Sequence, residues 1–204
     1  IHDGSKEVPA SRLRYRRILE ESLDEIFATE YKWMKDCIEA KLFGIGLESY
    51  TVGSYDFYLG YGAKKNKIVT LDTGHFHLTE SIADKVSSLL LFTPEIMLHV
   101  SRPIRWDSDH VVILNDDVQD LAREIVRCDA LDRVHIGLDY FDATINRIGA
   151  YVIGSRATQK AFMLALLETI ALLRQYEDEG KYFQRLALQE EAKSLPWGAV
   201  WDMY

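Results

Sequence analysis

Residues 67–100 read KIVTLDTGHFHLTESIADKVSSLLLFTPEIMLHV, in which two short apolar runs flank a helical pattern. The runs at residues 67–72 and 95–100 have the length and apolar content of buried strands, and residues 80–92 have the spacing of an amphipathic helix. Two strands joined by a helix in this way are parallel neighbours with a right-handed crossover. The stretch therefore predicts a β/α/β unit.

The same alternation continues on both sides of this unit. Ser11 can cap a helix over residues 12–28, and Asp116 or Asp117 can cap a helix through residues 117–127. The remaining expected features are strands at residues 37–43 and 134–139, a Gly/Ser/Tyr-rich stretch at residues 44–62, and a long helix over residues 146–173. Together these elements make about four β/α units, whereas a closed barrel has eight and typically about 250 residues. We therefore expect an α/β fold that holds roughly half of a barrel, as one partial-barrel domain over residues 1–204.

The composition indicates one soluble globular domain. Of the 204 residues, 48% are hydrophobic and 27% are charged, and the net charge of −8 disfavours a nucleic-acid partner. The two cysteines lie in unrelated contexts and form neither a disulfide framework nor a zinc motif. The apolar runs are far shorter than the roughly 18 residues that span a membrane. We expect a reduced, cytoplasmic protein without a membrane partner.

Side chains of the types that bind metals lie at or just after the ends of the apolar runs, in four segments. They are Glu39 in CIEAKLF, Asp72 and His75 in LDTGHFH, His99, Asp107 and Asp109 in LHVSRPIRWDSDH, and Asp139 in HIGLDYF. The strands of a parallel barrel present their site residues at these ends. Carboxylates gathered at one place repel each other and are costly to desolvate unless cations hold them. If all seven residues converge, two divalent ions together with Lys41 would balance the charge.

Each segment also has an ordinary interpretation when taken alone. Asp72 and His75 could serve capping and turn roles, Asp139 could cap the next helix, and a D-x-D pattern often marks a solvated loop. Glu39 and Lys41, two apart on one face of a strand, could form a structural salt bridge. Four consecutive strands that each end in a ligand-type group are improbable under four independent explanations of this kind. The combination therefore favours a metal site.

The D-S-D triplet at residues 107–109 follows Pro103, which predicts an extended segment. Alternation along an extended chain would place Asp107 and Asp109 on one side, where two carboxylates suit a hard or borderline cation. His110 would then point away from the metal. The other histidines that we expect to take no part are His2, His77 and His135.

Several long strings closely resemble the L-rhamnose isomerase family. They are EAKLFGIG, ESYTVGS, LDTGHFH, LHVSRPIRWDSDHVV, RVHIGLDYFDATINRI and EEAKSLPWGAVWDMY, and the resemblance covers essentially all 204 residues. It implies a (β/α)8 TIM barrel of the xylose-isomerase-like type. The chain would correspond to the C-terminal four β/α units, from the loop after the fourth strand through the eighth strand, followed by a helical C-terminal segment.

The resemblance also implies a two-metal site. Glu39, Asp72, His99 and Asp139 would hold a structural ion. His75, Asp107 and Asp109 would hold a catalytic ion, with Asp72 able to bridge the pair. Mixed nitrogen and oxygen ligation fits Mn²⁺, and Zn²⁺, Co²⁺ or Mg²⁺ would substitute in part.

The implied activity is the interconversion of L-rhamnose and L-rhamnulose by a metal-assisted 1,2-hydride shift in L-rhamnose catabolism. Lys41 would hydrogen-bond the sugar O1 and offset its developing charge, and Asp139 would assist proton transfer between oxygens. A Schiff-base role for Lys41 is disfavoured, because a carboxylate-rich pocket raises the pKa of a lysine. Family members form homotetramers, which the resemblance extends to the parent enzyme.

Alternative functions stay open at this point. Another aldose isomerase or a sugar epimerase of the same superfamily would share the barrel, whereas a metal-dependent phosphodiesterase would need more basic groups. A metal-stabilised segment without catalysis is the alternative of a different class. The first residue is Ile1 rather than methionine, so we expect a section of a longer chain, whose substrate-orienting residues lie elsewhere. Alone, it should show little or no activity.

Overall fold

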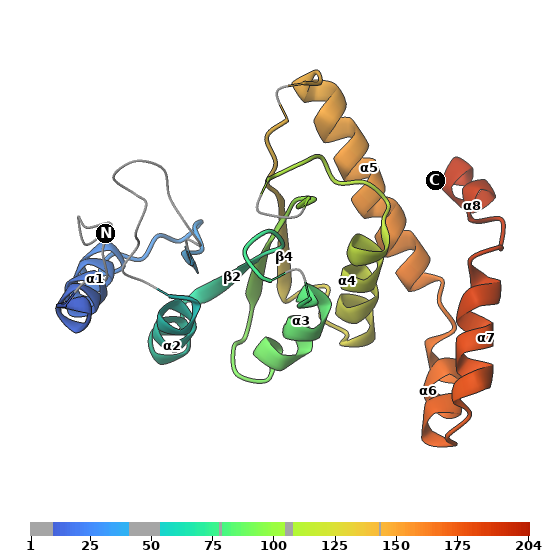
Figure 1. Cartoon of the computed structure of the whole chain (residues 1–204), viewed down its shortest axis with the longest axis horizontal. Helices are drawn as coiled ribbons and strands as arrows, with labels where there is room; N and C mark the ends of the chain where they lie inside the picture. The colour runs from blue at the N-terminus through green and yellow to red at the C-terminus, as the bar shows by residue number, and fades with distance from the viewer. Residues whose placement is uncertain (1–9, 41–53, 78, 105–107, 143) are drawn as a thin grey trace.

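The computed structural model describes residues 10–40, 54–77, 79–104, 108–142 and 144–204 (Figure 1). Its centre is a parallel sheet whose strands lie side by side in chain order. The strands are β1 (Cys37–Glu39), β2 (Ile68–Asp72), β3 (Ile96–Val100) and β4 (Val134–Leu138). The predicted parallel β/α arrangement is confirmed. Pairing in chain order is also what a barrel requires, and closure into a barrel of eight strands stays a prediction.

One face of the sheet is covered by helices. The helices α2 (Tyr55–Lys65), α3 (Ile82–Leu90), α4 (Asp116–Arg127) and α5 (Arg147–Leu166) each follow one strand. Along β3, Ile96, Leu98 and Val100 are buried, whereas Met97 and His99 on the opposite face are only half-buried. The helix residues that share a core cluster with the buried β3 side chains include Val86, Leu89, Leu121, Ile125 and Ala161. The helices therefore fill the apolar face and leave the polar face for a site.

The helix α1 (Arg12–Ile26) is joined to α2 by polar contacts. The Tyr61 hydroxyl donates a hydrogen bond of 2.8 Å to Asp24, which also accepts one of 2.8 Å from Lys65. Beneath these contacts Ile38, Tyr61 and Val69 form a second, smaller core cluster. Helix α1 therefore packs against the first β/α unit.

Three further helices lie beyond α5, on the side away from β2 (Figure 1). They are α6 (Ile170–Asp178), α7 (Tyr182–Ala192) and α8 (Trp197–Met203). A hollow of 940 Å³ between them and α4 and α5 includes none of the metal-type residues singled out above. Within the described residues, no helix is both long and apolar enough to cross a bilayer.

The predicted continuous helix over residues 146–173 is wrong. It ends at Leu166, and α6 begins at Ile170 after a short turn. This turn places Glu168 against α4, where its carboxylate accepts hydrogen bonds of 2.9 and 2.8 Å from Arg127. The helical spacing of apolar residues cannot predict a contact between residues that are 41 positions apart in the sequence.

Other boundaries also differ from the predictions. The Gly/Ser/Tyr-rich stretch contains α2, whose first turn is capped by Ser54 through a hydrogen bond of 3.4 Å from the Phe57 amide. The cap of α4 is Asn115 rather than Asp116 or Asp117, because its side chain accepts from Val118 N at 3.2 Å. Ser11 does precede α1, but its side chain makes no capping hydrogen bond within the described residues. The strand predicted over residues 37–43 is present as β1, and residues 41–43 lie outside the described residues.

Gly154 sets how closely α5 approaches the end of β4. A methyl group at Gly154 would overlap the hydroxyl of Tyr140, a buried side chain that donates a hydrogen bond of 3.0 Å to Ala150 O. We expect Gly154→Ala to lower the free energy of unfolding by about 1–3 kcal/mol, although alanine favours helices. Chemical denaturation measures this change. Gly149→Ala in the same helix is the control, since its methyl would meet only Asn146, at 3.9 Å or more, and an equal effect of both variants would contradict the prediction.

Glu95 joins three segments at the amino end of the sheet. Lys35 and His135 each lie 2.5 Å from its carboxylate, and in that order they lower the pKa of Glu95. A carboxylate whose pKa is lower in the folded than in the unfolded protein stabilises the fold at pH values above its unfolded pKa of about 4.3. This stabilisation is lost as the pH falls through the folded-state pKa.

Glu95→Gln should therefore reduce stability at pH 7 by up to about 1 kcal/mol, a difference that diminishes as the pH falls below about 4. Thermal unfolding across this pH range tests the expectation. Glu190→Gln, which removes the exposed pair with Lys193, is the control and should change little at any pH. A Glu95→Gln difference that persists unchanged in acid would count against the assignment.

Candidate metal centre

The carboxyl ends of the strands bring ligand-type side chains to one edge of the sheet. Glu39 is the last residue of β1 and Asp72 the last of β2. His99 pairs in register with Asp72, and Asp139 directly follows β4. Parallel strands in register point their partner side chains to the same face, so residues from distant parts of the sequence become neighbours.

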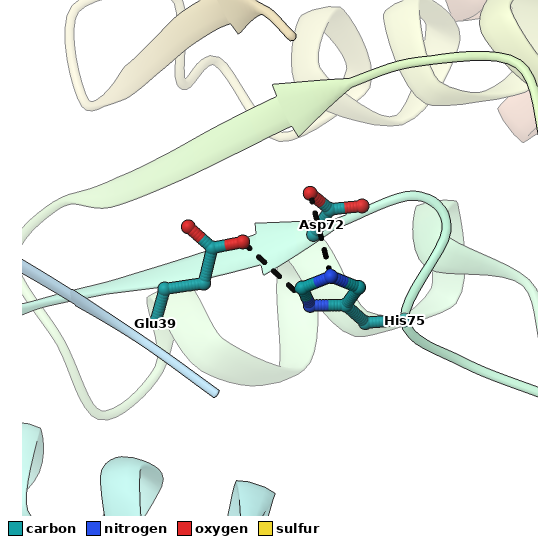
Figure 2. A group of neighbouring side chains, drawn as sticks. All are labelled: Glu39, Asp72 and His75. Carbon is teal, nitrogen blue, oxygen red and sulfur yellow. Dashed lines mark ion pairs between the residues drawn. The ribbon is translucent and has the colours of Figure 1, made fainter. Parts of the chain in front are cut away.

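The first group consists of Glu39, Asp72 and His75, which offer ligand atoms within 4.8 Å of one another. His75 Nδ1 lies 3.6 Å from Glu39 Oε1, and His75 Nε2 lies 3.9 Å from Asp72 Oδ2. Figure 2 shows both carboxylates directed at the ring of His75, which lies on the turn after β2. Each nitrogen of this ring thus faces a different carboxylate.

The second group consists of Asp72, His99 and Asp139, with ligand atoms that also lie within 4.8 Å of one another. His99 Nδ1 lies 3.5 Å from Asp139 Oδ2 and 3.9 Å from Asp72 Oδ2. The same nitrogen is 2.8 Å from Oε2 of Glu39, which connects this group to the first. Asp72 is common to both groups, and its side chain is 3% exposed.

Asp72 is oriented by the turn that follows it. Its Oδ1 accepts a hydrogen bond of 2.7 Å from the Gly74 amide, and its backbone carbonyl accepts one of 3.2 Å from the His75 amide. With Oδ1 held in this way, Oδ2 is the oxygen that lies nearest to both imidazoles. The turn therefore fixes a buried carboxylate between two histidines.

The electrostatics of these groups fit a bound cation. The Glu39 carboxylate, followed by those of Asp139 and Asp72, raises the pKa of His99 against the opposing effect of burial. Burial opposes the charge on Glu39, yet the neighbouring His99 and His75 rings lower the pKa of Glu39. Glu39 and His99 thus favour each other's charged forms.

His99 Nδ1 gives the sharpest indication of a metal. This atom is buried and has no hydrogen-bond partner in the part of the chain that the structure describes, although Glu39 Oε2 is only 2.8 Å away. The distance is short, but the angles are not those of a hydrogen bond. A buried polar atom without a partner is costly in a folded protein, and a metal ion would satisfy it. The donor set of two imidazoles and three carboxylates suits a borderline divalent ion.

Of the seven predicted ligands, five are brought together: Glu39, Asp72, His75, His99 and Asp139. Lys41 and Asp107 lie outside the described residues. Asp109 belongs to neither group.

The extended conformation predicted for the D-S-D segment is wrong at Asp109, whose φ of 44° is left-handed. The loop turns back on itself, because Arg102 pairs with His110 in an antiparallel bridge and the Ile104 amide donates to Ser108 Oγ at 3.0 Å. The alternation predicted for this segment therefore does not hold at Asp109. The Asp109 carbonyl accepts a hydrogen bond of 3.0 Å from the Phe141 amide, which connects this loop to the segment after Asp139.

Some supporting residues were missed by the sequence analysis. Thr73 Oγ1 donates to Ser101 O at 3.0 Å and accepts from Ser101 N at 2.9 Å, which joins the loop after β2 to the end of β3. His110 Nδ1 lies 3.7 Å from Asp142 Oδ2, on the loop after β4. The position of Thr73 between Asp72 and Gly74 was a signal for the first contact, whereas nothing in the sequence pointed to the second.

The other described histidines lie apart from the two groups. His77 Nδ1 is 2.8 Å from Thr79 Oγ1, and His135 contacts Glu95 at the opposite end of the sheet.

Comparison with known proteins shows the family. The model of the family L-rhamnose isomerase (RhaA) matches residues 1–204, which is the whole chain. The chain belongs to the L-rhamnose isomerase family. It is 72% identical over 204 residues to the L-rhamnose isomerase of Bacteroides thetaiotaomicron, and 58% identical over 206 residues to that of Cronobacter sakazakii. The L-rhamnose isomerase of Escherichia coli O127:H6 is 56% identical over 206 residues.

The match to these L-rhamnose isomerases covers 100% of this chain but 49% of each relative. The chain thus spans about half the length of the curated relatives it matches.

The two overlapping groups predict different effects of substitutions on metal binding by this chain. Asp72→Asn should weaken all binding of Mn²⁺ by roughly a hundredfold or more, because Asp72 belongs to both groups. Asp139→Asn should weaken binding to one group only, since Asp139 is in the second alone and its side chain is 60% exposed. Titration calorimetry on the 204-residue chain measures both changes.

Asp120→Asn on α4 is the matched control, because its carboxylate contacts Arg123 rather than either group, and it should leave Mn²⁺ binding unchanged. Two undiminished binding events in Asp72→Asn would contradict the shared role of this residue.

Proposed function

We propose that this chain carries the metal-binding part of an aldose–ketose isomerase that interconverts L-rhamnose and L-rhamnulose in L-rhamnose catabolism. The observation that carries the proposal is the pair of overlapping imidazole–carboxylate groups at one sheet edge, in a chain 72% identical to a curated L-rhamnose isomerase. Sites at the carboxyl ends of parallel strands are where barrel enzymes place their chemistry. The fold, the site and the family membership thus all favour a sugar isomerase.

The proposed ligand sets share Asp72. One divalent ion would be held by Glu39, Asp72, His99 and Asp139. The second would be held by His75, Asp107 and Asp109, with Asp72 between the two ions. The burial of Asp72 and its place in both groups support a bridging carboxylate, since an uncompensated buried charge would be strongly destabilising. Mixed nitrogen and oxygen donors favour Mn²⁺, and Zn²⁺, Co²⁺ or Mg²⁺ would substitute.

The proposed reaction is a 1,2-hydride shift between the first two carbons of the sugar. When bound, the ions polarise the sugar's carbonyl and hydroxyl oxygens, which makes transfer of hydride between C1 and C2 possible without a strong carbon base. Lys41 would donate a hydrogen bond to O1 and offset the negative charge that develops there. Asp139 would assist the transfer of the proton between O1 and O2, and its 60% exposure supports access to a sugar oxygen.

The proposed setting is a cytoplasmic homotetramer that has no nucleic-acid or membrane partner. The net charge of −8 favours cationic over polyanionic partners. Large apolar side chains are exposed on α5 and α7, including Ile148, Val152 and Phe183, which supports association with further polypeptide. The partial-barrel domain over residues 1–204 would be part of each subunit.

The activity is tested by exchanging the corresponding stretch of the Bacteroides thetaiotaomicron relative for this chain and measuring L-rhamnulose formation with Mn²⁺. We expect clear turnover, because the chain matches that relative over its whole length at 72% identity. Lys41→Met in the exchanged protein should lower kcat by roughly 10²–10³-fold while Mn²⁺ stays bound, since an electrostatic contact to the reacting oxygen is lost. Lys193→Met, which changes an exposed lysine on the C-terminal side, should leave kcat unaltered.

The outcomes separate this proposal from its alternatives. Epimerised aldose instead of ketose would identify a sugar epimerase. Bound metal without turnover in the exchanged protein would indicate a non-catalytic metal site. Full activity after removal of all divalent metal would rule out the metal-dependent mechanism.

A further inference from the structure

Gly137 is the residue of β4 that lies in register with His99 of β3. A glycine inside a strand weakens it and often marks a place where another group approaches closely. We propose that Gly137 is a positioning residue for the metal ligand His99: its missing side chain leaves the space that the imidazole occupies. This inference rests on the proposed metal-dependent function and adds to it a residue that binds neither metal nor sugar.

The space beside Gly137 is filled by two side chains of β3. A methyl group placed on Gly137 would lie 3.3 Å from Cδ2 of His99 and 2.8 Å from Cε of Met97. The Met97 methyl is the free end of a flexible side chain and moves away at little cost. The His99 ring has no such freedom, because its other edge faces the carboxylates.

The two edges of the ring are mechanically coupled. Cδ2 and Nδ1 of His99 are both attached to Cγ, so a rotation that moves Cδ2 away from position 137 moves Nδ1 as well. Nδ1 is the atom that lies 2.8 Å from Glu39 and 3.5 Å from Asp139. Metal–ligand distances tolerate deviations of only about 0.2 Å. A displacement of a few tenths of an ångström at Cδ2 therefore takes the ligand nitrogen out of its position.

Two other glycines provide matched controls. A methyl group on Gly60 in α2 would meet nothing within 4 Å, so Gly60→Ala should be neutral or stabilising. A methyl group on Gly62 would collide with a methyl group of Val69 and lie 3.1 Å from the carbonyl of Lys67. Gly62→Ala should destabilise the fold through contacts that do not include the His99 ring. Together they separate a general loss of stability from a specific effect on His99.

The first measurement uses the metal-free 204-residue chain and the imidazole Cε1–Hε1 NMR signals of its 6 histidines. His99→Gln identifies the His99 signal by its loss. Gly137→Ala should shift that signal by more than the linewidth and leave the His77 signal in place. Gly60→Ala and Gly62→Ala should leave the His99 signal where it is. An unmoved His99 signal in Gly137→Ala would overturn the proposal, whatever the metal affinity.

The second measurement is calorimetric titration of the same variants with Mn²⁺. Gly137→Ala should bind about tenfold more weakly, and Gly137→Val more weakly still, which is the range for losing a group that orients a ligand. Removing the flexible neighbour in Gly137→Ala/Met97→Ala should relieve the contact with Met97 without restoring Mn²⁺ affinity. Restored affinity would assign the effect to Met97 and overturn the role for His99.

The two measurements also distinguish a failure of this inference from a failure of the proposed function. If the unsubstituted chain binds no Mn²⁺ and yet Gly137→Ala shifts the His99 signal, the metal function fails while the contact between Gly137 and His99 stands. If the unsubstituted chain binds Mn²⁺ and Gly137→Ala changes neither signal nor affinity, the positioning role alone fails.

Discussion

The repulsion among clustered carboxylates is the constraint on which the rest of the structure depends. Glu39, Asp72 and Asp139 all present oxygens within 4 Å of one imidazole nitrogen, and the Asp72 side chain is 3% exposed. Carboxylates gathered around one atom in this way repel each other unless positive charge or hydrogen bonds compensate them. One backbone amide, that of Gly74, supplies part of this compensation and the two histidines supply more. A divalent ion would complete it, which is why these groups read as a metal site rather than as a salt-bridge network.

The alternation of side chains along the strands determines where these groups lie. In β3 the side chains alternate between the helix-covered face, with Leu98 and Val100, and the face that carries His99. A register shift of one residue would exchange the two faces, burying the imidazole among aliphatic side chains and exposing the core. The apolar packing against α3 and α4 therefore fixes the register, and the register fixes which ligands meet. Core and site are specified by the same alternation.

The strand ends were predictable from a local signal, since each short apolar run ends in or just before a polar group. The meeting of five ligand-type side chains followed from them, because parallel strands present their carboxyl ends at one edge. What the sequence could not provide depends on contacts between distant residues or on single side-chain bonds. The break between α5 and α6 accompanies the pairing of Glu168 with Arg127, and Asn115 rather than an aspartate caps α4. The left-handed backbone of Asp109 belongs to a loop that folds back through Arg102 and His110, so strand-like alternation failed there.

An ion-pair network lies at the amino end of the sheet, and the candidate metal site lies at its carboxyl end. At the amino end, Glu95 contacts both Lys35 and His135. At the carboxyl end, the Nδ1 of His99 has no hydrogen-bond partner among the described residues, and the carboxylates remain close together. Buried polar atoms without a hydrogen-bond partner are rare in folded proteins, and a bound ion is one way to satisfy them. Because β1 has only 3 residues, Lys35 and Glu39 lie just before and at the end of the same short strand, and the ion pair of Lys35 with Glu95 joins the start of that strand to the start of β3.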